Sequence, residues 1–165
     1  AVLDAIDTLD LAHPALTIEQ ISGILRRSVG GTSGPLYAAL TLAVAVSLRD
    51  DGGRLGLSDW ARAFASGCQA VSDLGGAQRG DRTMLDALLP AADALLAASL
   101  ESGSAEEALA RAGIAARAGT GQAVQLGPRL GRSSYPGQRA IGHVDPGAEA
   151  VTIWLGALPG KITSK

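Results

Sequence analysis

The sequence predicts an all-α protein, on two observations. Alanine is the most frequent residue and aromatic residues make up only 3%, a composition that favours closely approaching helices over sheets built from β-branched and aromatic side chains. Apolar residues also recur at helical spacing in several segments. The 165 residues, 47% of them hydrophobic, match one folded core of roughly 100 to 200 residues. We therefore expect a single helical domain over residues 1–165.

The first two helices are expected at 17–27 and 35–49. In the first, isoleucines recur at helical spacing, and Thr17 and Gln20 stand at the spacing of a capping box. The second begins at Pro35, a favourable first-turn residue, and ends before an Asp-Gly-Gly turn at 51–53. It is apolar nearly all round, which predicts a central position.

The next two helices are expected at 58–71 and 82–102. The serine at position 58 can cap the third helix, and Gly75-Gly76 ends it. Asp81 can cap the fourth, which contains Pro90. Because proline removes a helical hydrogen bond, we expect Pro90 to bend or divide this helix.

The last two helices are expected at 104–124 and 146–158. The fifth starts with a Ser-x-x-Glu capping box, and three glycines weaken its C-terminal half: Gly113, Gly119 and Gly121. Residues 126–145 show no hydrophobic period and predict a long loop, a feature that is usually functional or disordered. Asp145 is a good cap for the sixth helix.

Charge and cysteine content exclude several classes of protein. The net charge of -2 provides no broad field for nucleic acid or acidic membranes. The most apolar stretch, Tyr37 to Leu48, has 12 residues, whereas a membrane helix needs about 20. Cys68 is the single cysteine, so we expect it to be a small buried residue in a reducing, cytoplasmic compartment.

The densest chemical signal is Ser28-Val-Gly-Gly-Thr-Ser-Gly-Pro35, which leads directly into a helix. The free N–H groups and dipole of a helix start favour anions, glycines let the backbone approach phosphate oxygens, and hydroxyls add donors. The spacing is not that of a P-loop. A structural turn for close helix packing explains the same residues, and both interpretations stay open. The candidate phosphate-binding residues are Gly30, Gly31, Thr32 and Ser33.

Two further loop-to-helix entries carry candidate residues. Thr83 and Met84 follow Gly80-Asp81, and Met84 is a flexible apolar contact suited to a flat ring or to core packing. Asp145-Pro146-Gly147 can cap a helix, or Asp145 can accept hydrogen bonds from a ligand. Three arginines of the long loop suit phosphate oxygens or solvent equally: Arg129, Arg132 and Arg139.

Together these stretches resemble the nucleotide-binding L subunit, or C-terminal kinase domain, of dihydroxyacetone kinases. They occur in that family's order and spacing; the matching residues are Ser28–Pro35, Gly80–Met84, Gly131–Tyr135, Gly137–Arg139 and Gly142–Ala148. The resemblance implies an eight-helix antiparallel barrel, incomplete in this chain, that holds an adenine nucleotide at one end. It also implies phosphoryl transfer from ATP, or from a bound ADP recharged by a phosphotransferase protein, to a small ketose on a partner K subunit or domain.

The resemblance also implies roles for individual residues. Gly31 and Thr32 would contact the nucleotide, Gly75 and Met84 would line the adenine pocket, and Arg132 with Asp145 to Gly147 would close the site. Arg132 is the expected catalytic residue, because transition-state charge on the phosphoryl group must be stabilised.

One family feature is absent from the sequence. The family's loop of the form Gly-Asp-x-Asp-His-Gly-x-Asn, whose aspartates hold magnesium, does not occur. We expect the magnesium ligands and an N-terminal helix to lie upstream of this chain; the alternative is a degenerate member of the family that has lost its metals. Asp4, Asp7 and Asp10 are interpreted as a solvated helix start and not as metal ligands. Two alternatives remain: a non-catalytic regulator that keeps a bound nucleotide, and a purely structural bundle.

Overall fold

The computed structural model describes residues 1–49, 54–127 and 141–159. Every regular element in these ranges is helical, which confirms the all-α prediction. None of the helices in the described part of the chain combines the length and the apolar character that crossing a membrane requires. The chain forms two compact units, Ala1–Gly76 and Ala77–Lys165, and each is described by itself. The expectation of a single domain over 1–165 stays a prediction.

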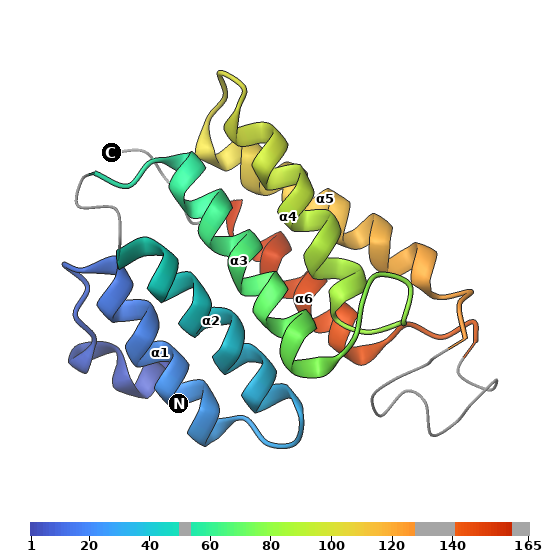
Figure 1. Ribbon diagram of the computed structural model, residues 1–165, viewed down its shortest axis with the longest axis horizontal. Coiled ribbons are helices and arrows are strands. Elements are labelled where there is room, and N and C mark those ends of the chain that lie inside the picture. The colour runs from blue at the N-terminus through green and yellow to red at the C-terminus, as the bar shows by residue number, and fades with distance from the viewer. Residues whose placement is uncertain (50–53, 128–140, 160–165) are drawn as a thin grey trace. The chain divides into compact units, whose positions relative to one another are not determined.

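The first unit is a set of antiparallel helices. A short 3-10 helix, Leu3–Thr8, precedes α1 (Pro14–Ser28), α2 (Ser33–Arg49) and α3 (Leu57–Gly75). Helix α2 packs against both α1 and α3 (Figure 1). The helices approach closely because small residues lie between them. A Cβ at Gly67 of α3 would lie 2.8 Å from the carbonyl oxygen of Leu40 in α2.

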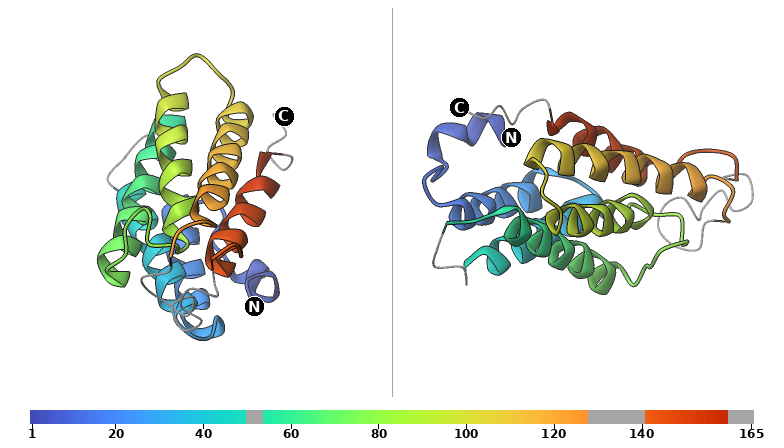
Figure 2. Two further views of the ribbon diagram at one scale, coloured as in Figure 1. Left: turned by 90° about the vertical axis from the view of Figure 1, so that its right-hand side faces the viewer. Right: turned by 90° about the horizontal axis from the view of Figure 1, so that it is seen from above.

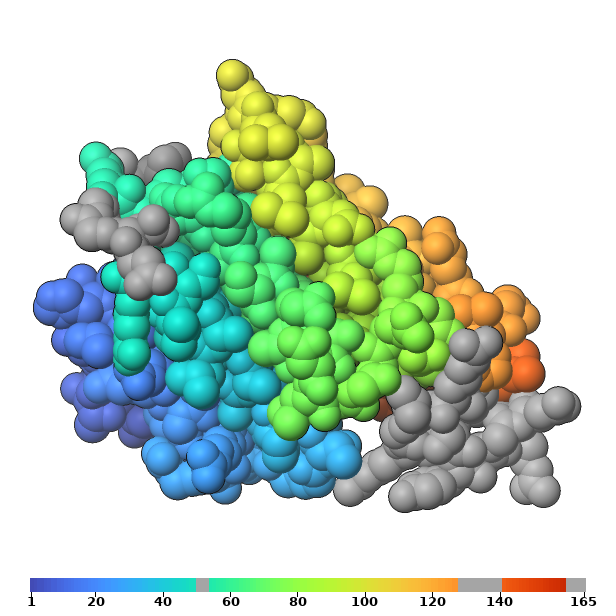
Figure 3. Space-filling model, viewed as in Figure 1, coloured from blue at the N-terminus to red at the C-terminus, as the bar shows by residue number. Residues whose placement is uncertain are grey.

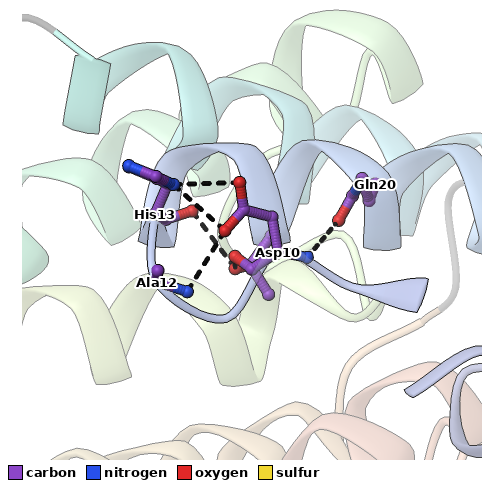
Figure 4. A network of polar contacts seen from close by, with 5 residues as sticks. Asp10, Ala12, His13 and Gln20 are labelled. Atoms are coloured by element: carbon purple, nitrogen blue, oxygen red, sulfur yellow. Dashed lines mark hydrogen bonds and ion pairs between the residues drawn. The ribbon is translucent and has the colours of Figure 1, made fainter. Parts of the chain in front are cut away.

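Helix α1 begins at Pro14, three residues before the predicted start. The predicted Thr17–Gln20 capping box is wrong, because both residues instead bind the turn that precedes the helix (Figure 4). The Gln20 side chain accepts a hydrogen bond from the backbone N–H of Asp10 at 2.9 Å. The Thr17 hydroxyl donates to the carbonyl of Asp10, and the Asp10 carboxylate pairs with His13 Nδ1 at 2.9 Å. Proline at the first helical position needs no N–H partner, which explains the earlier start.

The other two starts in this unit also differ from prediction. Helix α2 begins at Ser33, two residues early. Helix α3 begins at Leu57, and Asp59 rather than Ser58 accepts the N–H of the cap residue Gly56, at 2.7 Å. The predicted stop of α3 is confirmed, because Gly76 adopts the left-handed conformation with φ of 65°. The predicted turn at 51–53 lies outside the described residues.

The second unit contains α4 (Leu85–Ser99), α5 (Ala105–Ala123) and α6 (Pro146–Ala157). Helices α4 and α5 form a hairpin, and α6 packs against both (Figure 2). The tip of the hairpin is exposed at the surface (yellow in Figure 3). The predicted capping box of α5 is confirmed: Ser104 Oγ accepts the Glu107 N–H at 3.1 Å, and Glu107 accepts the Ser104 N–H at 3.0 Å.

Helix α4 runs through Pro90, which does not divide it. Proline has no N–H to donate to the carbonyl of Asp86, four residues earlier. Gly119 of α5 lies directly against this carbonyl, and a Cβ at position 119 would lie 2.0 Å from its oxygen. The C-terminal half of α5, expected to be weak, is therefore helical and closely packed. The buried hydroxyls of Thr120 and Thr152 add a hydrogen bond of 2.9 Å between α5 and α6.

Candidate functional site

In the first unit, the candidate residues lie in the short connection between α1 and α2. Gly30, Gly31 and Thr32 are exposed in this loop, and Gly31 has a φ of 68°. The next glycine, Gly34, is buried in the first turn of α2, where a Cβ would lie 2.1 Å from the carbonyl oxygen of Val29. A side chain is thus excluded at position 34 and strained at position 31. The loop presents backbone and hydroxyl groups at a helix start, where N–H groups lack helical partners.

Gly75 lies at the same end of this unit. It is the last residue of α3, and a Cβ on it would lie 3.5 Å from Leu36 Cδ2 in the first turn of α2. The first unit therefore brings together five of the predicted site residues: Gly30, Gly31, Thr32, Ser33 and Gly75.

In the second unit, the segment 77–84 forms a loop and not the first turn of a helix. Helix α4 begins only at Leu85, so the predicted start at residue 82 is wrong, and Thr83 and Met84 precede the helix. The predicted cap, Asp81, instead accepts the backbone N–H of Gln78 at 2.9 Å.

Asp86 organises the entry to α4. One of its carboxylate oxygens accepts the Gly80 N–H at 2.6 Å, and the other accepts the Thr83 N–H at 2.9 Å. A carboxylate in the first turn of a helix is favoured by the free N–H groups and by the helix dipole. Asp86 is only 4% exposed, so these bonds hold the loop firmly against the helix start.

The other predicted residues of this unit lie at the start of α6. Asp145 caps the helix as predicted, because it accepts the Ala148 N–H at 2.9 Å, and Pro146 occupies the first turn. A Cβ at Gly147 would lie 2.9 Å from Asp145 Oδ2 and 3.4 Å from the Cβ of Met84. The structure therefore places Met84 and Gly147 side by side, although they are 63 positions apart in the sequence.

Arg82 connects the same two loops. Its side chain is buried, with 2% exposure, and its Nη2 donates a hydrogen bond of 2.5 Å to the carbonyl oxygen of His143. Its backbone has a φ of 59°, which is uncommon for any residue with a side chain. Sequence reasoning missed both Arg82 and Asp86. The only sequence signal is that both charged residues stand close to the apolar stretch 84–92, where charges are rarely buried without a partner.

Some predicted site residues cannot be placed. Arg132, together with Arg129 and Arg139, lies outside the described residues.

Within the described ranges no group of three or more His, Cys, Asp or Glu side chains is arranged to hold a metal ion. Asp4 and Asp7 are exposed on the 3-10 helix. The described residues therefore do not fit a magnesium site.

Comparisons with known proteins identify relatives of the chain. Residues 1–159 match the family described as the DAK2 domain. The chain is 34% identical over 151 residues to the PEP-dependent dihydroxyacetone kinase, ADP-binding subunit DhaL, of Escherichia coli, covering 86% of this chain and 70% of that protein. It is 36% identical over 149 residues to a putative 3,4-dihydroxy-2-butanone kinase of Solanum lycopersicum, covering 89% of this chain and 25% of that protein.

A solved structure shows a similar fold. The crystal structure of the dihydroxyacetone kinase from C. freundii in complex with AMP-PNP and Mg2+ superimposes with a TM-score of 0.71 at 29% identity. The match covers 93% of this chain and 24% of the kinase chain. The chain thus spans about a quarter of the tomato and C. freundii proteins and 70% of the bacterial subunit.

Proposed function

Because the chain belongs to the DAK2 domain family, we propose that it is the nucleotide-binding part of a dihydroxyacetone-type kinase. It binds ATP, or an ADP that is recharged in place, and the γ-phosphoryl group passes to a small ketose held by a partner K subunit or domain. Relatives named as kinases, one of them an ADP-binding subunit, support this role.

The observation that carries the proposal is the contact between Met84 and Gly147. The starts of α4 and α6, far apart in the sequence, meet at Met84 and Gly147. The atoms around Gly147 leave no room for a side chain at this position. A methionine adapts its flexible, polarisable side chain to a flat ring, and a glycine lets a ligand approach the backbone. Met84 and Thr83 are proposed to contact the adenine, and Asp145 to Gly147 to close over the nucleotide.

The loop before α2 is proposed to bind the phosphates. Gly30 and Gly31 are exposed and carry no side chain that would keep a phosphate from the backbone. Thr32 and Ser33 add hydroxyl donors, and the start of the 17-residue helix α2 contributes positive dipole charge. Gly75 is proposed to line the adenine pocket. These roles are tested separately from those of the second unit, by substitutions in each.

Catalysis is proposed to depend on positioning and charge, since phosphoryl transfer requires little covalent chemistry from the protein. Arg132 is the proposed catalytic residue, whose guanidinium stabilises charge on the transferred group. The crystal structure of the C. freundii relative contains AMP-PNP and Mg2+, and we propose that the nucleotide binds to this chain together with magnesium.

The test is a transfer assay with the full-length protein, magnesium, dihydroxyacetone and a K partner. ATP and a phosphorylated phosphotransferase protein are supplied in separate reactions, and phosphorylated ketose is measured. We expect product with one donor, and a loss of roughly a hundredfold or more in turnover for Arg132→Ala. The matched variant Arg62→Ala removes an exposed arginine of α3 and should keep full turnover. Nucleotide binding without transfer from either donor would favour a regulatory protein.

A further inference from the structure

We propose that Arg82 is a positioning residue: by holding the His143 carbonyl, it fixes the loop 141–147 against the loop 77–84 and so sets the spacing between Met84 and Gly147. The inference rests on the proposed function, in which these two residues contact the nucleotide. Arg82 itself acts through the loop and not on the ligand.

Burial is the first argument for this role. The Arg82 side chain is 2% exposed, so its guanidinium has lost its hydration, which is strongly unfavourable unless hydrogen bonds replace the water. One such bond is present: Nη2 donates to the carbonyl oxygen of His143 at 2.5 Å. A charged donor makes a stronger and more directional bond than a neutral one. The long side chain therefore links two loops that are 61 positions apart.

Backbone conformation is the second argument. Arg82 has a φ of 59°, a left-handed conformation that a non-glycine residue keeps only when its surroundings determine it. The bonds of the neighbouring residues provide this constraint. Asp86 accepts the N–H groups of Gly80 and Thr83, on either side of Arg82. The base of the Arg82 side chain is thus fixed relative to α4.

The far end of the link is equally well placed. His143 lies two residues before Asp145, which caps α6 through Ala148 N–H at 2.9 Å. Gly147 follows two residues after Asp145. It lies against Met84, since a Cβ built on Gly147 would be 3.4 Å from the Cβ of Met84. The approach of Met84 to Gly147 is a van der Waals contact, which does not by itself fix the orientation of the two loops. The hydrogen bond from Arg82 to the His143 carbonyl is directional and therefore orients the loop 141–147 on the loop 77–84.

The experiment compares Arg82→Ala and Arg82→Lys with Leu95→Ala in the full-length protein. Leu95 is a buried residue of α4 and has no part in the proposed site, so its truncation reports loss of stability alone. Calorimetry measures the dissociation constant of MgADP, and thermal unfolding measures Tm at the same pH. Hydrogen exchange without nucleotide measures protection of the Ala148 amide, which Asp145 binds.

We expect Arg82→Ala to raise the dissociation constant about tenfold or more, the size of a lost hydrogen bond to a charged group. Arg82→Lys keeps one charged donor but not the planar fork, so it should restore part of the affinity. Leu95→Ala should lower Tm by a similar amount yet leave the dissociation constant within about twofold. The Ala148 amide should exchange faster in Arg82→Ala than in Leu95→Ala.

The outcomes separate this inference from the proposed function. If the unsubstituted protein does not bind MgADP, the proposed function fails, and the exchange measurement still decides whether Arg82 orders the loop. If the unsubstituted protein binds and Arg82→Ala binds equally well while folded, Arg82 is not a positioning residue. Equal Ala148 exchange in Arg82→Ala and Leu95→Ala would overturn the inference as well.

Discussion

At the scale of single residues, the position of Gly147 is too closely surrounded to accept a side chain. A Cβ there would lie 2.9 Å from Asp145 Oδ2 and 3.4 Å from Met84 Cβ. We predict that Gly147→Ala pushes the start of α6 away from Met84 and weakens MgADP binding about tenfold, because small displacements are costly in a preformed site.

The control for this substitution is Gly121→Ala. Gly121 also lies in the second unit, within α5, and nothing lies within 4 Å of a Cβ built there. Its replacement should leave the dissociation constant unchanged. Calorimetric titration of both variants with MgADP gives the comparison, and equal affinities in the two would show that Gly147 is not part of the site.

Glu107 gives a prediction about pH. The Ser104 backbone N–H and hydroxyl group lower the pKa of Glu107 below its ordinary value of 4.5, with a smaller contribution from Arg111. Because the folded pKa is lowered, the ionised carboxylate stabilises the protein above pH 4.5, and this contribution is lost as pH falls through the folded pKa. Glu107→Gln cannot ionise, so its stability deficit should shrink over that acidic range.

The measurement is urea unfolding of the unsubstituted protein and Glu107→Gln at several pH values. Glu106→Gln, which alters the neighbouring acidic residue of the same first turn, is the control. A stability difference between Glu107→Gln and the unsubstituted protein that does not change with pH would contradict the capping assignment.

At the scale of elements, the packing of α5 on α4 depends on Gly119. A Cβ at this position would lie 2.0 Å from the Asp86 carbonyl oxygen and 2.8 Å from Pro90 Cγ. Because backbone cannot move aside easily, we predict that Gly119→Ala destabilises the protein by about 3 kcal/mol, at the upper end for overpacking. Gly121→Ala, by contrast, should be neutral or stabilise by up to about 1 kcal/mol.

Chemical denaturation of the two variants measures this difference. The same stability for Gly119→Ala and Gly121→Ala would mean that α5 does not pack against the carbonyl that Pro90 leaves without its usual helical partner.

The helices themselves could be predicted from the sequence, but several of their starts could not. Hydrophobic spacing indicates the first helix, and cap, proline and glycine signals indicate the other five α-helices of the described ranges. The predicted caps Ser104 and Asp145 are confirmed. The starts predicted at 17, 35, 58 and 82 differ from those in the structure. Serine, threonine and aspartate side chains can bind several nearby backbone groups with similar energy, so their positions alone do not fix a helix start. Which one they bind is decided by contacts with the preceding loop, as Asp86 shows by accepting the N–H groups of Gly80 and Thr83.

The site was predictable in a similar, partial way. The resemblance of three motifs pointed to Met84 and Gly147, and the structure brings these two together within the second unit. The motifs do not indicate that Arg82 is buried and bonded to His143, because that bond joins residues 61 positions apart in the sequence. Arg132 lies outside the described residues, so its role stays a prediction.

At the scale of the whole molecule, each compact unit has one group of candidate residues at helix ends. The first unit presents the glycine loop before α2, with Gly75 beside it, and the second presents Met84 against Gly147. Each group is a candidate nucleotide contact under the proposed function. Substitutions within each unit therefore test that unit's group by its own effect on MgADP binding.

The most direct test of this account is the equilibrium unfolding of the full-length protein with and without MgADP. A ligand at 100 times its dissociation constant should raise the free energy of unfolding by about 2.7 kcal/mol. We predict an increase of this size for MgADP, reduced at the same ligand concentration in both Gly31→Ala and Gly147→Ala. An unfolding free energy that does not respond to saturating concentrations of MgADP or MgATP would contradict the central claim that this chain binds a nucleotide.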